Sequence, residues 1–359
     1  MAKHAAARIP WWAWFWPALS CAVLATAFAL GLGAVVTALA GVALIATVFA
    51  AVWHAEIVAH RVGEPFGTLV LAVAVTVIEV ALIVSVMLGG GAEKAALARD
   101  TVFAAVMLVC NGVVGACLLA GGMRHGRQGF QVQGASAALA VLAALTVLTL
   151  VLPNYTVSTP GPVFTRGQLA FVGVVSLLLY GAFVFEQTVR NPGDFLPDEA
   201  EDHGPRPSRG LALASAGLLA VSLVAVVGLA KALSPSMEAG LAWAGAPKPV
   251  IGVVIAALVL LPEALAAIRA ARDNRLQTSL NLALGSALAS IGLTIPAVAV
   301  VSIALGTPLT LGLDPKETVL LALTVLVGGV TLGTGRTTVL QGAVHLVILA
   351  VFLFLSVVP

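Results

Sequence analysis

Long runs of apolar residues, separated by short polar breaks, repeat along the whole chain. A helix that rises 1.5 Å per residue needs about 20 apolar residues to cross the hydrocarbon core of a bilayer. Hydrocarbon also forces backbone groups to bond within their own segment, which favours helices. The pattern therefore predicts an all-α polytopic membrane protein with eleven transmembrane helices. The predicted spans are 12–31, 34–53, 64–89, 101–121, 135–153, 167–188, 210–231, 249–270, 277–304, 317–334 and 338–358.

Composition excludes most other classes of protein. The chain has 359 residues, of which 60% are hydrophobic and 9% charged, with a mean hydropathy of +1.08. A typical soluble domain is roughly 25% charged, so neither a soluble enzyme nor a disordered chain is expected. A net charge of +2 without a basic cluster argues against a nucleic acid partner. Cys21, Cys110 and Cys117 lie in apolar runs without metal or disulfide spacing, and we expect no bound cofactor.

The distribution of Lys and Arg tests the number of spans and orients them. With the N-terminus in the cytoplasm and eleven alternating spans, twelve of the 18 Lys and Arg residues fall on the cytoplasmic side. Cytoplasmic loops of membrane proteins carry such an excess of positive charge. The sequence therefore predicts a multi-pass protein of the cell inner membrane, with the N-terminus in the cytoplasm and the C-terminus in the periplasm.

One acidic, proline-rich segment, residues 191–209, interrupts the apolar pattern and is predicted to be a cytoplasmic linker. Five spans precede it after the first helix, and five follow it. Because five is odd, the two groups must cross the membrane in opposite senses, as in the inverted repeats of many secondary transporters. The predicted parts are an extra N-terminal helix (1–33), a first repeat (34–190), the linker (191–209) and a second repeat (210–359).

Two glutamates occupy matching places in these repeats. Glu79 follows Pro65 by 14 residues, and Glu263 follows Pro249 by 14 residues. The two prolines begin helices at opposite membrane faces, so each glutamate lies about 21 Å from its own face. Both carboxyl groups are therefore predicted near the middle of the bilayer.

A carboxylate near the bilayer centre costs at least about 2.5 kcal/mol, so it needs a partner or a function. Hard oxygen ligands suit Ca²⁺, Na⁺ or K⁺, and the same oxygens also take protons. Leaving two carboxylates charged and close together is unfavourable, so each ligand would neutralise the site that the other has left. The alternative is a pair of protonated glutamates that only form hydrogen bonds within the helix bundle.

Several nearby polar side chains are candidate auxiliary ligands: Thr76, one turn before Glu79, and Asn111, Ser286 and Ser290 on the helices that follow the glutamate helices. Ser286 and Ser290 are four residues apart and share a helix face. Hydrogen bonding between helices is the alternative role for all of them. His345, inside the last span, is either part of a proton path or a hydrogen-bonding partner for a neighbouring helix.

Two other functional classes were weighed. An intramembrane hydrolase would also place polar residues at membrane depth, but the sequence contains neither His-Glu-x-x-His nor Gly-x-Ser-x-Gly. An ion channel needs a continuous pore, and paired carboxylates would bind a divalent ion tightly and slow its release. Both classes are therefore less favoured than a transporter.

The residues around the glutamates resemble those of the ChaA-type cation/proton antiporters. The first match is the segment from His60 to Leu69, running on to Ile78-Glu79-Val80, and the second is Leu260-Leu261-Pro262-Glu263-Ala264-Leu265 with residues 279–296. Tyr180-Gly181-Ala182-Phe183, the acidic linker, Gly335-Arg336-Thr337 and His345 extend the match over nearly the whole chain from about residue 50.

The ChaA type belongs to the calcium/cation antiporter superfamily, in its calcium/proton exchanger branch. This resemblance implies an extra first helix, two inverted five-helix repeats, and alternate binding of cation and proton by Glu79 and Glu263. The chain departs from the exchanger branch where a Gly-Asn pair usually precedes each glutamate, since it has Ala74-Val75-Thr76 and Leu260-Leu261-Pro262 there. The predicted function is export of Ca²⁺ in exchange for H⁺, with Na⁺/H⁺ or K⁺/H⁺ exchange as the alternative; the partners are inorganic cations, protons and the lipid bilayer.

Overall fold

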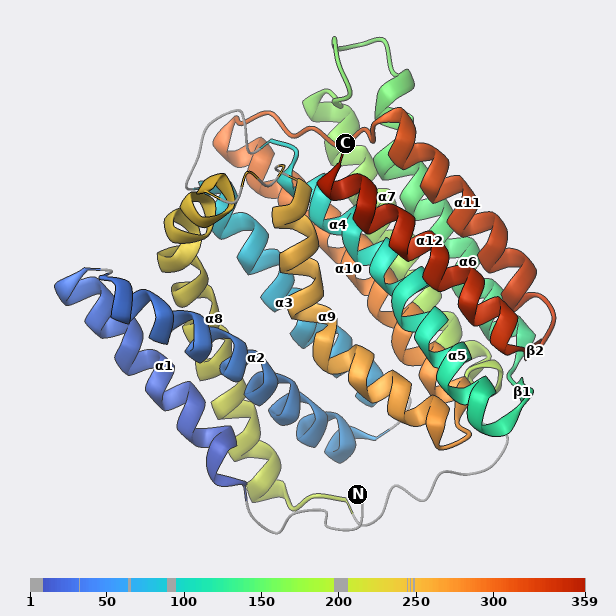
Figure 1. Ribbon diagram of the computed structural model, residues 1–359, viewed down its shortest axis with the longest axis horizontal. Coiled ribbons are helices and arrows are strands. Elements are labelled where there is room, and N and C mark those ends of the chain that lie inside the picture. Colours follow the sequence, from blue (N-terminus) through green and yellow to red (C-terminus); the bar gives the residue numbers. More distant parts are fainter. Residues whose placement is uncertain are drawn as a thin grey trace. The chain divides into compact units, whose positions relative to one another are not determined.

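The computed structural model describes residues 9–31, 33–63, 66–88, 95–196, 206–243, 245, 247 and 249–358. Its elements are almost all helices (Figure 1). In chain order they are α1 (Trp11–Leu30), α2 (Ala34–Val62), α3 (Phe66–Leu88), α4 (Leu97–Met107), η2 (Leu108–Val113), α5 (Val114–His125), β1 (Gln128–Gly129), α6 (Val132–Thr146), η3 (Val147–Val151), η4 (Leu152–Tyr155), α7 (Arg166–Phe185), η5 (Glu186–Arg190), η6 (Pro192–Asp194), α8 (Arg209–Trp243), α9 (Pro249–Arg272), α10 (Leu276–Leu305), α11 (Pro315–Leu332), β2 (Arg336–Thr337) and α12 (Val339–Val357).

Every predicted span has a helical counterpart. Within the described residues, ten helical stretches are long and apolar enough to cross a membrane, and the eleventh predicted span corresponds to α3, which has 23 residues. The all-helical membrane fold is thereby confirmed. Pro65 and the acidic stretch 197–205, on which two of the sequence arguments rest, lie outside the described residues.

The helices pack into two compact units. Unit 1 contains α1, α2, α3 and α8, with α2 packed against α1, α3 and α8. Unit 2 contains α4 to α7 and α9 to α12, with α10 packed against α6, α7 and α9, and α12 packed against α5. Each unit takes helices from both sides of the linker. This division concerns packing, so the two inverted repeats stay a prediction.

Three of the spans in unit 2 are not uniform α-helices. The α4–α5 span contains the π-helical turn η2, the α6 span continues into η3, and α7 continues into η5. A π-helical turn inserts one extra residue into the helix, frees a backbone group from its usual partner and often marks a functional site. The hydrophobic pattern predicts the spans but not these turns, because the inserted residue leaves the run apolar.

Short polar segments join the spans of unit 2. β1 and β2 form a two-stranded antiparallel sheet in which Gln128 pairs with Thr337, so the end of α5 lies beside the start of α12. The beginning of the predicted linker also packs: the ring of Phe195 is buried and lies 5.7 Å from that of Phe183, and the Asn281 amide donates to the backbone carbonyl of Phe195. Residues 191–196 are therefore part of unit 2, which the sequence reading of a fully solvated loop did not anticipate.

Candidate functional site

Glu263 lies in the middle of α9, and only 6% of it is exposed. The Ser286 hydroxyl, on the neighbouring helix α10, donates a 2.5 Å hydrogen bond to carboxylate oxygen Oε2 of Glu263. Pro262 precedes the glutamate and has no N–H to give the carbonyl of Leu258 one turn earlier. A buried carboxylate and a hydroxyl thus come together, and hard cations bind such oxygen atoms.

Ser290, one helical turn after Ser286, is also buried. The two serines lie on one face of α10, as their spacing predicts. The structure thus brings one predicted auxiliary ligand, Ser286, into contact with Glu263, and it places Ser290 on the same helix face, one turn further along.

Asn111 lies at the same depth in unit 2 as Glu263. A Cβ atom at Gly252 of α9 would lie 2.8 Å from the carbonyl carbon of Asp100 in α4, so the two helices touch there. A Cβ atom at Gly121, near the end of α5, would lie 3.1 Å from the carbonyl oxygen of Ala271, near the end of α9. The α4–α5 span and α9 are therefore parallel neighbours. Asn111 and Glu263 each follow the first contact by eleven residues, and they precede the second by ten and eight residues, so their heights agree to within about one helical turn.

The Asn111 side chain is held by a buried polar network that joins three helices. Its Nδ2 donates to Thr324 Oγ1 of α11 at 2.9 Å, and its Oδ1 lies 3.2 Å from His345 Nδ1 of α12. His345 Nε2 lies 3.1 Å from Thr331 Oγ1, also on α11. Asn111, His345, Thr324 and Thr331 are all at most 2% exposed. Of the two roles that the sequence left open for His345, the structure shows hydrogen bonding to neighbouring helices.

Glycines allow this network to form because they bring α12 close to α5. A Cβ atom at Gly115 would lie only 2.9 Å from the Cβ atom of His345, and one at Gly342 would lie 2.6 Å from the backbone nitrogen of Leu119. Figure 1 shows α12 running beside α5 along much of its length. The apolar pattern of the spans does not predict which helices touch here. The small residues at these positions are, however, typical of closely packed helices.

Glu79 belongs to unit 1. It is 1% exposed, near the middle of α3, and Thr76 one turn earlier is also buried. The Thr76 hydroxyl donates to the carbonyl of Ala72 in its own helix, at 2.8 Å. The structure therefore places both predicted glutamates in buried positions within their own units, and gives Thr76 a partner in its own backbone.

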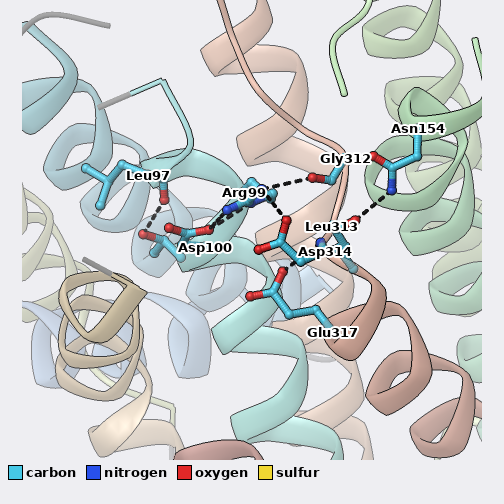
Figure 2. Close-up of polar contacts among 9 residues, drawn as sticks. Leu97, Arg99, Asp100, Asn154, Gly312, Leu313, Asp314 and Glu317 are labelled. Carbon is cyan, nitrogen blue, oxygen red and sulfur yellow. Dashed lines mark hydrogen bonds and ion pairs between the residues drawn. The ribbon is translucent and has the colours of Figure 1, made fainter. Parts of the chain in front are cut away.

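A second polar cluster lies at the N-terminal ends of α4 and α11. Figure 2 shows Arg99 between its partners: the guanidinium donates to Asp100 at 2.8 Å and to the carbonyl of Gly312 at 2.9 Å, and Nη1 lies 4.0 Å from Asp314. The Glu317 side chain accepts from the backbone N–H of Asp314, which closes a capping box on α11. Arg99 thereby ties the start of α4 to the start of α11.

These acids border a cavity of about 230 Å³. Asp100, Asp314, Lys316 and Glu317 contribute charged groups to its wall, and Phe103 an apolar one. Within the described part of the chain, no three His, Cys, Asp or Glu side chains are spaced to hold a metal ion. The signal that the sequence offered for this cluster was the pair Arg99-Asp100, directly before the predicted span 101–121.

Comparison with known proteins identifies the family. Residues 32–189 and 214–358 match the sodium/calcium exchanger protein family, on the two sides of the predicted linker. The chain is 50% identical over 358 residues to y4hA of Sinorhizobium fredii, a protein named for a proposed role as an ionic transporter, with 98% of each chain covered. It is 35% identical over 321 residues to the sodium-potassium/proton antiporter ChaA of Escherichia coli, covering 88% of this chain and 87% of ChaA.

The fold is also that of a solved exchanger. The structure of native YfkE superposes with a TM-score of 0.74 at 18% sequence identity, covering 97% of this chain and 100% of YfkE. Together these findings confirm the resemblance that the glutamate segments suggested. The chain therefore belongs to the sodium/calcium exchanger protein family and is a multi-pass membrane transporter that exchanges inorganic cations.

Proposed function

We propose that the protein is a proton-coupled antiporter of the cell inner membrane, which exports a cation from the cytoplasm while protons enter. The observation that carries the proposal is Glu263, a 6% exposed carboxylate inside a membrane-spanning helix with a serine hydroxyl donating to it. Glu79 is its proposed counterpart in the other repeat, buried in α3. In this proposal both glutamates bind cation and proton alternately.

The chemistry of buried carboxylates supports exchange rather than passive flow. A carboxylate removed from water needs a positive charge or a proton beside it, because an uncompensated charge in a low dielectric is costly. An empty site with uncompensated charge is therefore disfavoured. The transporter must bind either the cation or protons before it reorients, and this requirement couples the two fluxes. Reorientation of the two repeats about the glutamates would supply alternating access.

Ca²⁺ is the first candidate for the exported ion. The carboxylate of Glu263 and the hydroxyl that donates to it are hard oxygen ligands, which suit Ca²⁺. YfkE, which shares the fold, is named a Ca²⁺/H⁺ antiporter. Two carboxylates also match an exchange of two protons for one divalent ion.

Na⁺ or K⁺ exchange is the second candidate, and one specific observation favours it. ChaA, 35% identical over most of both chains, is named a sodium-potassium/proton antiporter. This chain also has Thr76 and Pro262 before its glutamates, where the exchanger branch usually has a Gly-Asn pair. The two candidates share one scaffold and one pair of carboxylates.

The test is flux in proteoliposomes that contain only this protein. With an imposed proton gradient, uptake of Ca²⁺, Na⁺ and K⁺ is measured separately, together with the proton flux in the opposite direction. We expect cation-dependent proton movement in the wild type and none in Glu263→Gln or Glu79→Gln, which cannot carry the charge. Normal exchange by either variant would remove that glutamate from the mechanism, and cation flux without proton movement would overturn the coupling.

A further inference from the structure

The network around Asn111 determines which hydrogen-bonding groups face one another. The Thr324 hydroxyl lies 2.7 Å from the carbonyl of Leu320, one turn earlier in α11, and donates its only proton there. Its oxygen must therefore accept from Asn111, so the NH₂ end of the carboxamide faces Thr324 at 2.9 Å. The carboxamide oxygen is then the group that faces His345 Nδ1 at 3.2 Å.

This assignment fixes the tautomer of His345. A carboxamide oxygen only accepts hydrogen bonds, so His345 Nδ1 must carry a proton and donate it to Asn111. In the neutral ring Nε2 then has no proton and accepts from the Thr331 hydroxyl, at 3.1 Å. The imidazole thus uses both nitrogens and links η2 to α11.

We propose that His345 is a positioning residue for cation exchange, which holds the Asn111 carboxamide in one orientation through its Nδ1–H group. This inference rests on the proposed function. Asn111 lies level with Glu263 along two touching helices, in the π-helical turn η2. In the observed orientation His345 fixes the carboxamide oxygen of Asn111. Rotation of the carboxamide by half a turn would put its NH₂ group in the place of that oxygen, and an N–H group repels a cation.

The same geometry argues against His345 as a step of the proton path through Asn111. A proton relay needs groups that both accept and release protons, such as hydroxyls, carboxyls or imidazoles. The Nδ1 proton of His345 ends on an amide oxygen, which accepts a hydrogen bond but does not pass a proton on. A positioning role and a proton-relay role of His345 therefore predict opposite results for a substituted side chain that still donates a hydrogen bond to Asn111 but cannot bind or release a proton.

Asn and Gln substitutions separate these two roles. The amide nitrogen of Asn is as many bonds from Cα as histidine Nδ1, and that of Gln as many as Nε2. His345→Asn therefore keeps a donor toward Asn111 but cannot bind a proton, whereas His345→Gln keeps a group toward Thr331 and leaves Asn111 without its donor. His345→Leu removes both groups, and Thr331→Val removes only the partner of Nε2.

The experiment measures cation KM and Vmax in proteoliposomes for the wild type, these four variants and Glu263→Gln. We expect His345→Asn and Thr331→Val to stay within about threefold of the wild-type KM. For His345→Gln and His345→Leu we expect KM to rise about tenfold or more while Vmax changes little. If His345→Asn loses exchange as fully as His345→Leu, or if all three His345 variants behave like the wild type, the positioning role is wrong.

A second measurement does not depend on transport. In protein labelled with ¹⁵N-histidine, the signals that disappear in His345→Asn belong to His345 and report which nitrogen carries the proton. We expect the Nδ1–H tautomer, and the Nε2–H tautomer would overturn the proposal. If Glu263→Gln still exchanges normally, the proposed function fails, while the tautomer still decides whether Asn111 is held as described.

Discussion

Ser286 and Glu263 are joined by a 2.5 Å hydrogen bond that links α10 to α9 inside unit 2. The serine is the donor and a carboxylate oxygen is the acceptor, so the bond holds the Glu263 carboxylate against α10. A hydrogen bond to a charged group contributes about 1.5 to 3 kcal/mol. Ser286 therefore orients the carboxylate that is proposed to bind the cation.

Replacing Ser286 by alanine should weaken cation binding. Loss of about 1.5 kcal/mol, the lower end of that range, from the cation-bound form corresponds to a rise of at least about tenfold in the cation KM. Ser286→Thr keeps the hydroxyl and should stay near the wild-type KM. The matched control is Ser176→Ala in α7, a buried serine whose hydroxyl donates to the carbonyl of Val172 in its own helix. Equal KM values for Ser286→Ala and Ser176→Ala would show that the bond has no role in binding.

Apparent cation affinity should depend on pH with a definite sign. Protons and cation compete for the same carboxylates, so lowering the pH raises the cation KM by about tenfold per unit for each proton displaced, once the empty site is mostly protonated. At higher pH the site is already deprotonated and KM should become constant. Initial rates of cation uptake between mildly acidic and alkaline pH, at fixed proton gradient, measure this. A KM that stays flat across the whole range would exclude a shared site.

The sequence was sufficient for the spans because their physical basis is local. Each span must satisfy its own backbone and present apolar side chains to lipid, so composition along about 20 residues decides it. The same reasoning identified Glu79 and Glu263, because placing a charged side chain within an apolar span costs free energy, and such residues can be recognised in one sequence. Both are buried near the middle of their helices, and their place at the middle of the bilayer stays a prediction.

The contacts between helices were beyond such reasoning. Nothing in the sequence shows that Asn111 bonds to His345, 234 positions later, or that Arg99 reaches the carbonyl of Gly312. These pairings depend on which helices become neighbours and at which heights they touch. The extra residue in η2 also turns Asn111 relative to a regular α-helix, which a period of 3.6 residues does not anticipate.

Removal of the Arg99 guanidinium should destabilise unit 2. Arg99 and Asp100 are each 8% exposed, and Arg99→Leu would leave the Asp100 carboxylate buried without its counter-ion. Breaking a buried ion pair in this way costs about 3 kcal/mol. We expect a clear fall in the melting temperature of the purified protein in detergent, with exposed Arg124→Leu as the control. A melting temperature equal to that of the control would mean that the cluster in Figure 2 does not hold the two helices together.

The close approach of α5 and α12 gives the last prediction. In Gly115→Ala the new methyl group would lie 2.9 Å from the Cβ atom of His345, which is too close, and the backbone of α12 must move away. Overpacking of this kind costs about 1 to 3 kcal/mol. The movement should also lengthen the bond between His345 and Asn111, so the cation KM should rise together with the loss of stability.

Gly181→Ala in α7 is the matched control, because a Cβ atom there meets nothing within 4 Å. Alanine has the higher helix propensity, so this variant should be as stable as the wild type or up to about 1 kcal/mol more stable. Thermal melting in detergent and cation KM in proteoliposomes are measured for both variants. If Gly115→Ala melts lower but binds cation normally, the glycine contact serves only packing. If both variants match the wild type, α5 and α12 are not held as closely as described.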